Sequence, residues 1–269
     1  MPDPYEARLA RSSGAIGENS WYRWKAMRDT SDFTIIPTLD LKDGIAVHAI
    51  AGDRAAYRPV VSPLGQADDP VAIARGLLAV SGSSVLYIAD LDAITGSGSN
   101  FELVRDLGYA LPEITVWVDA GFSRVTDCAF WLPLGATLVI GSESLKGADD
   151  WREIKEVFAA SLVLSLDSDE GGPRGPAALF GKPALWPDRI IAMNLSRVGT
   201  GQGPDIEGLK SVVEKAKGRA VFAAGGVRDA RDLAAIEAAG AKGALVATAL
   251  HTGAITQKEI AALLRERRS

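Results

Sequence analysis

The sequence predicts an α/β fold, a (β/α)8 TIM barrel built from two similar half-barrels, which forms one domain over residues 33–269. Three observations lead to this prediction: eight short apolar runs, helix-like segments between them, and a repeat of the first half of the chain in the second. Continuous apolar runs that alternate with helices are typical of parallel strands covered on both faces. Eight such units in one chain of 269 residues favour a closed barrel over an open sheet.

The predicted strands are rich in β-branched residues and cover residues 33–40, 84–92, 114–121, 136–142, 162–169, 189–196, 220–226 and 243–249. Amphipathic helices are expected between them, because residues 69–82, 100–111 and 229–241 carry apolar side chains at three- and four-residue spacing. The segment "PRGPAALFGKPALWPD" (173–188) instead contains four prolines, so the helix after the fifth strand is expected to be shortened or missing.

The two halves of the chain resemble each other at the strand ends. "IIPTLDLKDG" resembles "LVLSLDSDEGG", which places Asp40 opposite Asp167, and "LYIADLDAITGSGSN" resembles "IIAMNLSRVGTGQG", which places Asp90 opposite Asn194. "VWVDAGFSRVTD" likewise resembles "VFAAGGVRDARD". A duplicated half-barrel explains why strands 1 to 4 echo strands 5 to 8.

Composition excludes several classes of protein. The net charge is −5 and the basic residues are dispersed, so no nucleic-acid partner is expected, and no apolar run is long enough to predict a membrane span. The single cysteine, Cys128, lies in an apolar helix-like stretch and is interpreted as a buried structural thiol in a cytoplasmic protein. His48 and His251 lie too far from other ligand types to predict a metal site. The oligomeric state is left open.

Residues 1–32 are interpreted as an extension before the first strand. The stretch has no apolar core of the length that a secretory signal needs, and its acidic residues argue against a mitochondrial transit peptide. Its segment "WYRWKAM" could form an amphipathic helix whose tryptophans dock on the barrel wall, and a partly disordered tail is an equal alternative.

Two aspartates are the predicted catalytic residues. In this fold the C-terminal ends of the strands build the active site, so Asp40 after the first strand and Asp167 after the fifth should face each other across the barrel mouth. One ionised and one protonated carboxylate on opposite sides of a substrate make a general acid–base pair. The alternative is that each carboxylate only caps the turn that follows. Lys42 and Asp43 are expected to belong to the turn after the first strand.

Glycines at the strand ends predict phosphate binding. Loops after strands 7 and 8 of such barrels hold phosphate through backbone N–H groups, and glycine lets the backbone approach closely. Two such sites, one in each half, would suit a substrate with a phosphate at each end. The second-half candidates are Gly201, Gly203, Gly225, Gly226, Ala247 and Thr248, and the first-half candidates are Gly121, Gly141 and Ser142.

"IIPTLDLKDGIAV", "LYIADLDA", "LSLDSD", "SRVGTGQGPD" and "AAGGVRD" together resemble the histidine-biosynthesis barrels. This family comprises the phosphoribosylformimino-aminoimidazole carboxamide ribotide isomerase and the cyclase subunit of imidazole glycerol phosphate synthase. The resemblance implies a (β/α)8 fold, no metal or other cofactor, and catalysis by the two strand-end aspartates, with Asp40 as base and Asp167 as acid. The isomerase performs an Amadori rearrangement, which opens an aminoaldose ring and moves a proton from C2.

The chain departs from the family pattern at several positions. The isomerase usually reads "GGGIR" after the third strand, whereas "DAGFS" here places Asp119 where a phosphate would lie, and an added carboxylate repels that dianion. The first-half site should therefore bind phosphate poorly. Val198 stands where the isomerase carries an acid, Met193 where it has a threonine, and His48 where the cyclase has a lysine. His48, Asn194 and Asp119 are further candidate site residues.

These observations leave three hypotheses. The preferred one is a diverged paralogue that acts by aspartate acid–base chemistry, as an isomerase or lyase, on a phosphorylated sugar-like or cofactor-precursor substrate. Uncharacterised members similar to both enzymes occur in organisms that use methanopterin-type one-carbon cofactors, so one-carbon metabolism is the expected setting. The alternatives are a genuine histidine-pathway isomerase and a non-catalytic binding or scaffold barrel.

Overall fold

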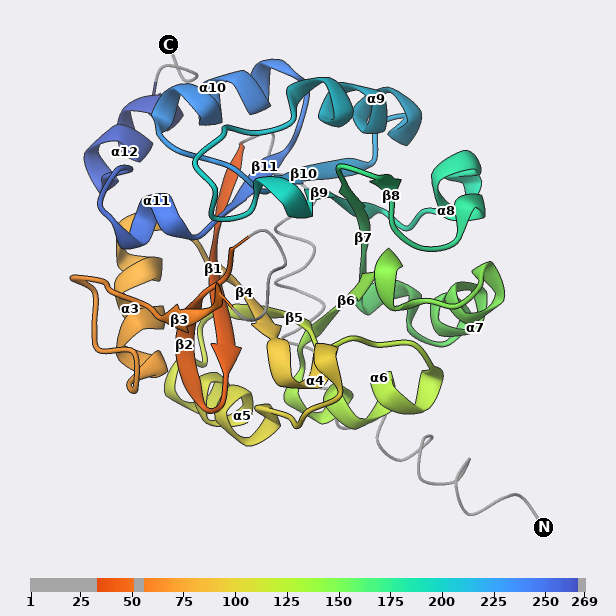
Figure 1. Cartoon of the computed structure of the whole chain (residues 1–269), viewed down its shortest axis with the longest axis horizontal. Coiled ribbons are helices and arrows are strands. Elements are labelled where there is room, and N and C mark those ends of the chain that lie inside the picture. The colour runs from red at the N-terminus through yellow and green to blue at the C-terminus, as the bar shows by residue number, and fades with distance from the viewer. Residues whose placement is uncertain (1–32, 51–55, 266–269) are drawn as a thin grey trace.

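A closed parallel barrel forms the body of the protein, as the sequence predicts. The computed structural model describes residues 33–50 and 56–265. Its strands follow the order β1-β4-β5-β6-β7-β9-β10-β11, and β11 pairs in parallel with β1 to close the ring. Figure 1 shows these strands at the centre with helices around them. The (β/α)8 prediction is therefore confirmed, and all eight predicted strands lie where the apolar runs placed them.

The bounds of the elements agree with the sequence patterns to within a few residues. The barrel strands are β1 (Thr34–Lys42), β4 (Val85–Asp90), β5 (Thr115–Asp119), β6 (Thr137–Gly141), β7 (Leu162–Asp169), β9 (Arg189–Asn194), β10 (Ala220–Ala224) and β11 (Gly243–Val246). Three short strands lie outside the ring, β2 (Ile45–His48), β3 (Arg58–Pro59) and β8 (Gly172–Pro173). The helices are α3 (Pro70–Ser81), α4 (Leu91–Thr95), α5 (Phe101–Ala110), α6 (Val125–Trp131), α7 (Ala148–Phe158), α8 (Ala177–Gly181), α9 (Ile206–Ala216), α10 (Ala230–Ala238), α11 (Thr248–His251) and α12 (Gln257–Arg265).

Alternation along each strand divides the core into two layers. Side chains of one parity point into the barrel, where Trp117 packs edge-on against Phe222 with ring centroids 5.1 Å apart. Side chains of the other parity, such as Val116 and Val118, pack against the surrounding helices. Successive strand residues face opposite sides, so Asp119 points the same way as Trp117. The end of β5 therefore brings a carboxylate over the inner apolar layer.

The segment after β7 lacks a full helix. It contains only the five-residue α8 and a 3-10 turn at Pro183–Leu185, as the prolines predict. Two buried tryptophans fasten this segment: the indole N–H of Trp186 donates to the carbonyl of Leu179 at 2.6 Å, and that of Trp151 in α7 donates to the carbonyl of Leu185 at 2.9 Å. These bonds cover the barrel wall at this point without a long helix.

The first strand continues past the residue at which the sequence suggested its end. β1 runs to Lys42 because its last three residues pair in antiparallel fashion with β2, with Asp40 opposite Val47. Asp43 and Gly44 form the turn, and both have left-handed backbones with φ of 52° and 78°. Lys42 therefore ends the strand, and its ammonium pairs with the carboxylate of the exposed Asp43.

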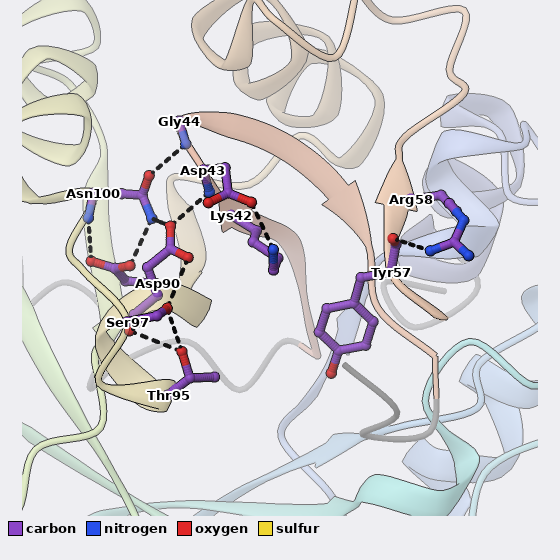
Figure 2. Close-up of polar contacts among 10 residues, drawn as sticks. Lys42, Asp43, Gly44, Tyr57, Arg58, Asp90, Thr95, Ser97 and Asn100 are labelled. Carbon is purple, nitrogen blue, oxygen red and sulfur yellow. Dashed lines mark hydrogen bonds and ion pairs between the residues drawn. The ribbon is translucent and has the colours of Figure 1, made fainter. Parts of the chain in front are cut away.

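A buried polar network fixes this turn to the next βα unit, as Figure 2 shows. The side-chain amide of Asn100 donates to Asp90 at 2.7 Å and to Asp92 at 2.9 Å, and its carbonyl accepts the backbone N–H of Gly44 at 3.0 Å. Asp92 also accepts the N–H of Asp43 at 2.6 Å. The strand-end Asp90 is fully buried, and it thus has a structural role.

The proposed docking of Trp21 and Trp24 falls within residues 1–32, outside the described residues. Within residues 33–50 and 56–265, no helix is both long and apolar enough to cross a membrane. Cys128 is fully buried in α6, and burial raises the pKa of its thiol to about 12. The interpretation of Cys128 as a structural thiol agrees with this position.

Candidate active site

A cavity of about 750 Å³ opens at the C-terminal ends of the barrel strands. Asp40 from β1, Asp119 from β5 and Asp167 from β7 all contribute to its lining. Asp40 and Asp167, the two aspartates that the repeat places opposite each other, therefore lie in one cavity. In this fold that end of the barrel is where catalytic residues gather.

Asp167 is held by donors from two chain segments. One carboxylate oxygen accepts the hydroxyl of Ser165 at 2.5 Å, and the other accepts the backbone N–H of Glu143 at 3.1 Å and the hydroxyl of Ser142 at 3.3 Å. These donors favour the ionised carboxylate, but burial outweighs them and raises the pKa of Asp167 to about 7. Asp167 can therefore either give or take a proton near neutral pH.

Asp119 occupies the same part of the cavity and is nine-tenths buried. It accepts the backbone N–H of Gly121 at 3.0 Å and the hydroxyl of Tyr87 at 3.4 Å. Burial raises its pKa to about 7. Burial, and then the charges of the three nearby aspartates, also raises the pKa of Tyr87 well above its ordinary value, so the phenol stays protonated as a donor.

Asp40 lies on β1, across the barrel from Asp167 on β7, and is partly exposed to the cavity. Burial again raises its pKa to about 7, although a hydrogen bond with the backbone of Ala49 opposes the shift. The barrel mouth thus holds three carboxylates that titrate close to neutrality. Asp119 is the member whose proximity to Asp167 the sequence did not predict.

The close approach of Asp119 and Asp167 depends on Gly141 at the end of β6. A Cβ atom on this glycine would lie 3.1 Å from the Oδ2 of Asp167 and 3.5 Å from the Oδ2 of Asp119. Gly141 therefore leaves room for two carboxylates rather than serving as a loop donor. The charge of Asp119 contributes to the raised pKa of Asp167, as the charge of Glu143 also does.

The predicted first-half phosphate residues do not line the cavity. Gly121 donates its N–H to Asp119, and the hydroxyl of Ser142 donates to the backbone carbonyl of Arg174 at 2.6 Å as well as to Asp167. The chain packs tightly there, because a Cβ at Gly175 would lie 2.0 Å from the carbonyl oxygen of Ser142. The donors of this site are already used by the chain's own acceptors.

The predicted second-half residues gather on the other side of the cavity. Gly201, Gly225, Gly226, Ala247 and Thr248 all line it. Gly203 lies behind them, because a Cβ at Gly226 would come within 2.3 Å of the Gly203 carbonyl oxygen. The cavity-lining Arg228 packs beside Gly203, and its guanidinium forms two 2.8 Å hydrogen bonds with the carboxylate of Asp232. This side of the cavity therefore carries a positively charged side chain, that of Arg228.

The remaining candidates lie just behind the cavity wall. The Nε2 atom of His48 is 2.9 Å from the hydroxyl of Thr248, which connects the β1–β2 hairpin to the start of α11, just after β11. Asn194 donates to Asp205, the N-cap residue of α9, at 3.2 Å. Met193 and Val198, which replace polar family residues, both line the cavity. The second half of the cavity wall is therefore more apolar than the family pattern implies.

Sequence reasoning missed Tyr87, Glu143, Arg174 and Arg228, which all line the cavity. Tyr87 had a usable signal, because it lies two residues before Ala89 and therefore shares its inward face. No signal in the sequence indicated that the phenol would point toward Asp119. The two arginines lie in loops whose course depends on contacts between distant segments.

Comparison with known proteins places these features in a family. A family model described as "Histidine biosynthesis protein" matches residues 34–256. An isomerase of Chloroflexus aggregans, whose name describes an imidazole-4-carboxamide with two phosphoribosyl groups, is 30% identical over 242 residues, which cover 85% of this chain and 97% of the relative. The corresponding isomerase of Halobacterium salinarum is 29% identical and covers 87% and 98%. An uncharacterized protein of Methanocaldococcus jannaschii is also 29% identical, over 84% and 96%.

Proposed function

The chain belongs to the histidine biosynthesis protein family, and from that premise we propose that it is an acid–base enzyme acting on a phosphorylated, sugar-like substrate. It is a diverged relative of the isomerases. The observation that carries the proposal is the pair Asp40 and Asp167, which come from opposite halves of the barrel, line one cavity, and have pKa values raised to about 7.

The proposed chemistry is proton transfer on opposite faces of one substrate. A catalytic acid and base work best when their pKa values lie near the working pH, because both protonation states are then populated. In an isomerisation of the Amadori type, Asp167 would protonate the ring oxygen as the ring opens, and Asp40 would remove the proton from C2. This division of roles follows the family resemblance and stays a prediction.

The anion of the substrate is proposed to bind on the second-half side alone. Gly225, Gly226, Ala247 and Thr248 line that side together with Arg228. On the other side, Asp119 and Asp167 already use the donors of Gly121, Ser142 and Glu143. Crystals grown with inorganic phosphate test this directly. Anion density beside Gly226 is expected, and density beside Asp119 without any near Gly226 would contradict it.

Substitution of the aspartates tests the catalytic proposal. Asp40→Asn and Asp167→Asn should each reduce turnover on the order of 10²–10⁴-fold, because each removes a positioned acid or base. The double variant should be little worse than either single variant, since the two carboxylates act as a unit. Asp106→Asn, on the outer helix α5, is the matched control. Near-normal turnover in both catalytic variants would refute acid–base roles for the pair.

A second candidate is the histidine-pathway isomerase reaction itself. The names of the Chloroflexus and Halobacterium relatives favour it, and these names describe a substrate with two phosphoribosyl groups. The added carboxylate of Asp119 and the loss of polar residues at Met193 and Val198 favour a different substrate, and a precursor of a one-carbon cofactor remains our expected class. Expression in an isomerase-deficient strain separates the two. Growth without histidine would support the pathway reaction, and failure to grow despite folded protein would exclude it.

A further inference from the structure

The charged side chains are distributed unevenly around the cavity, and this distribution bears on the class of substrate that the proposed active site binds. Among the residues that the structure describes, five carboxylates line it, Asp40, Asp119, Glu143, Asp167 and Asp169, against two arginines, Arg174 and Arg228. Both arginines already have carboxylate partners, since Arg174 lies 3.4 Å from Asp169 and Arg228 is bound by Asp232. The end formed by β5, β6 and β7 therefore presents surplus negative charge to whatever the cavity holds.

This acidic end occupies the place where a half-barrel repeat would predict a second anion site. Its backbone and hydroxyl donors point at carboxylates of the chain itself: Gly121 to Asp119, and Glu143 and Ser142 to Asp167. Asp119 thus stands where a substrate phosphate would otherwise accept the Gly121 N–H. Because the acceptor is now part of the protein, the substrate group that completes this end must be a donor, preferably a cation.

We propose that the substrate carries a protonated amine or amidine at this end, bound by Asp119, and a single phosphate at the opposite end. This inference rests on the acid–base function proposed above and adds its substrate class. Tyr87 acts as the positioning residue, because its buried hydroxyl lies 3.4 Å from the Asp119 Oδ2 and orients that carboxylate toward the cavity. Gly141 contributes by leaving room for the Asp119 carboxylate beside Asp167.

The charges around Asp119 favour the binding of a cation. Asp119 is surrounded by Asp90 and Glu143, which raise its pKa further, and by Tyr87 and the Gly121 N–H, which lower it. An ammonium group beside Asp119 would lower the pKa of that carboxylate, so binding should release protons at pH 7. A neutral hydroxyl cannot supply this charge, and a second phosphate would add to the repulsion.

Three synthetic probes of equal chain length test the proposal: an ω-aminoalkyl phosphate, the matching ω-hydroxyalkyl phosphate, and the alkane bisphosphate. Dissociation constants are measured by calorimetry with the full chain at pH 8, over a range of chain lengths. The aminoalkyl phosphate should bind about 10- to 100-fold more tightly than the hydroxyl compound, because a charged group then meets a desolvated carboxylate. The bisphosphate should bind most weakly.

Two variants test whether Asp119 causes the preference for the amine. Asp119→Asn should remove the preference for the amine, and Asp119→Gly, which frees the Gly121 N–H, should raise the affinity for the bisphosphate. Asp106→Asn should leave the order unchanged. Proton release on amine binding, measured in buffers of different ionisation enthalpy, should disappear in Asp119→Asn if the carboxylate is the group that titrates.

The outcomes separate this inference from the proposed function. If the hydroxyl compound or the bisphosphate binds as tightly as the amine, or if Asp119→Asn keeps the preference, the amine assignment is overturned while phosphate binding stands. If none of the three probes binds and inorganic phosphate at high concentration does not bind either, both the amine assignment and the proposed function fail together.

Discussion

Asn100 donates its side-chain amide to Asp90, while in the second half of the barrel Asn194 donates to Asp205. The positions of the carboxylate and the amide are therefore interchanged between the two halves. In the first half the acid lies at the strand end and the amide before the helix, and in the second half the order is reversed. Each pair joins the end of a barrel strand to the N-cap residue of an outer helix, α5 in the first half and α9 in the second. The equivalence detected in the sequence between Asp90 and Asn194 therefore reflects one hydrogen bond built in two ways.

This relationship predicts a large loss of stability in Asn100→Ala. The change removes the donors to Asp90 and Asp92 and the acceptor for Gly44 N–H, all in a buried setting. A loss of roughly 2–4 kcal/mol in the free energy of unfolding is expected, because each buried polar group left without a partner costs about 1–3 kcal/mol. Urea denaturation measures it. Asn100→Asp should destabilise further as the pH rises, and stability independent of pH would contradict the proposed role.

Gly226 and Gly218 form a matched pair for testing close packing at the second-half site. Both have a φ of 87°, but a Cβ at Gly226 would meet the carbonyl oxygen of Gly203 at 2.3 Å, whereas nothing lies within 4 Å at Gly218. Gly218→Ala should cost only backbone strain, about 1 kcal/mol. Gly226→Ala should cost about 1–3 kcal/mol more and should also weaken the binding of inorganic phosphate. Equal losses in the two variants would show that the Gly203 contact does not constrain the loop.

The raised pKa of Asp119 predicts an unusual dependence of stability on pH. Its folded pKa of about 7 lies above the reference value of 3.8. The native state therefore holds the proton more tightly, and stability falls as the pH rises from about 4 to 7. Asp119→Asn removes this term and should be more stable than the parent at pH 8 by roughly 2–4 kcal/mol, a gain that vanishes near pH 4.

The quantity to measure is the difference in the free energy of unfolding between the parent and Asp119→Asn, by urea denaturation at several pH values. His251 works in the opposite sense over the same range, because burial lowers its pKa to about 4 and its protonation disfavours the folded state. Subtraction cancels that contribution. A gain for Asp119→Asn that is constant across pH would refute the carboxylate as its origin.

Cys128 should be inert in the folded protein. It is fully buried, and burial raises the pKa of its thiol to about 12, so almost no thiolate is present at neutral pH. A thiol reagent such as dithiobis-nitrobenzoate should react only after denaturation, with one thiol per chain. Rapid labelling of the native protein would mean that α6 opens locally.

The barrel could be predicted from the sequence because its determinants are local. Each strand is a continuous apolar run, and the half-chain repeat by itself places Asp40 and Asp167 at equivalent strand ends. The prolines of residues 173–188 likewise predicted the shortened helix. In each case a short stretch of sequence determines the feature.

The contacts of Ser142 and Tyr87 could not be predicted in this way. Ser142 was expected to serve a phosphate, but its hydroxyl turns to Asp167 and Arg174 because the β7–β8 hairpin packs directly on it. The direction of the Tyr87 phenol depends on Asp119, which lies on a neighbouring strand. Both depend on side-chain packing between segments far apart in the chain, which leaves no periodic trace in the sequence.

The pairing of β1 with β11, in which Thr34 lies opposite Gly243, has a consequence for biosynthesis. The ring cannot close until the last barrel strand has left the ribosome, so the edge of β1 over residues 34–37 and the outer edge of each newly added strand stay open throughout translation. Unpaired edges of apolar strands are templates for association between chains. The nascent protein is therefore most prone to aggregate just before residue 246 emerges, and slower translation of the second half would prolong that exposure.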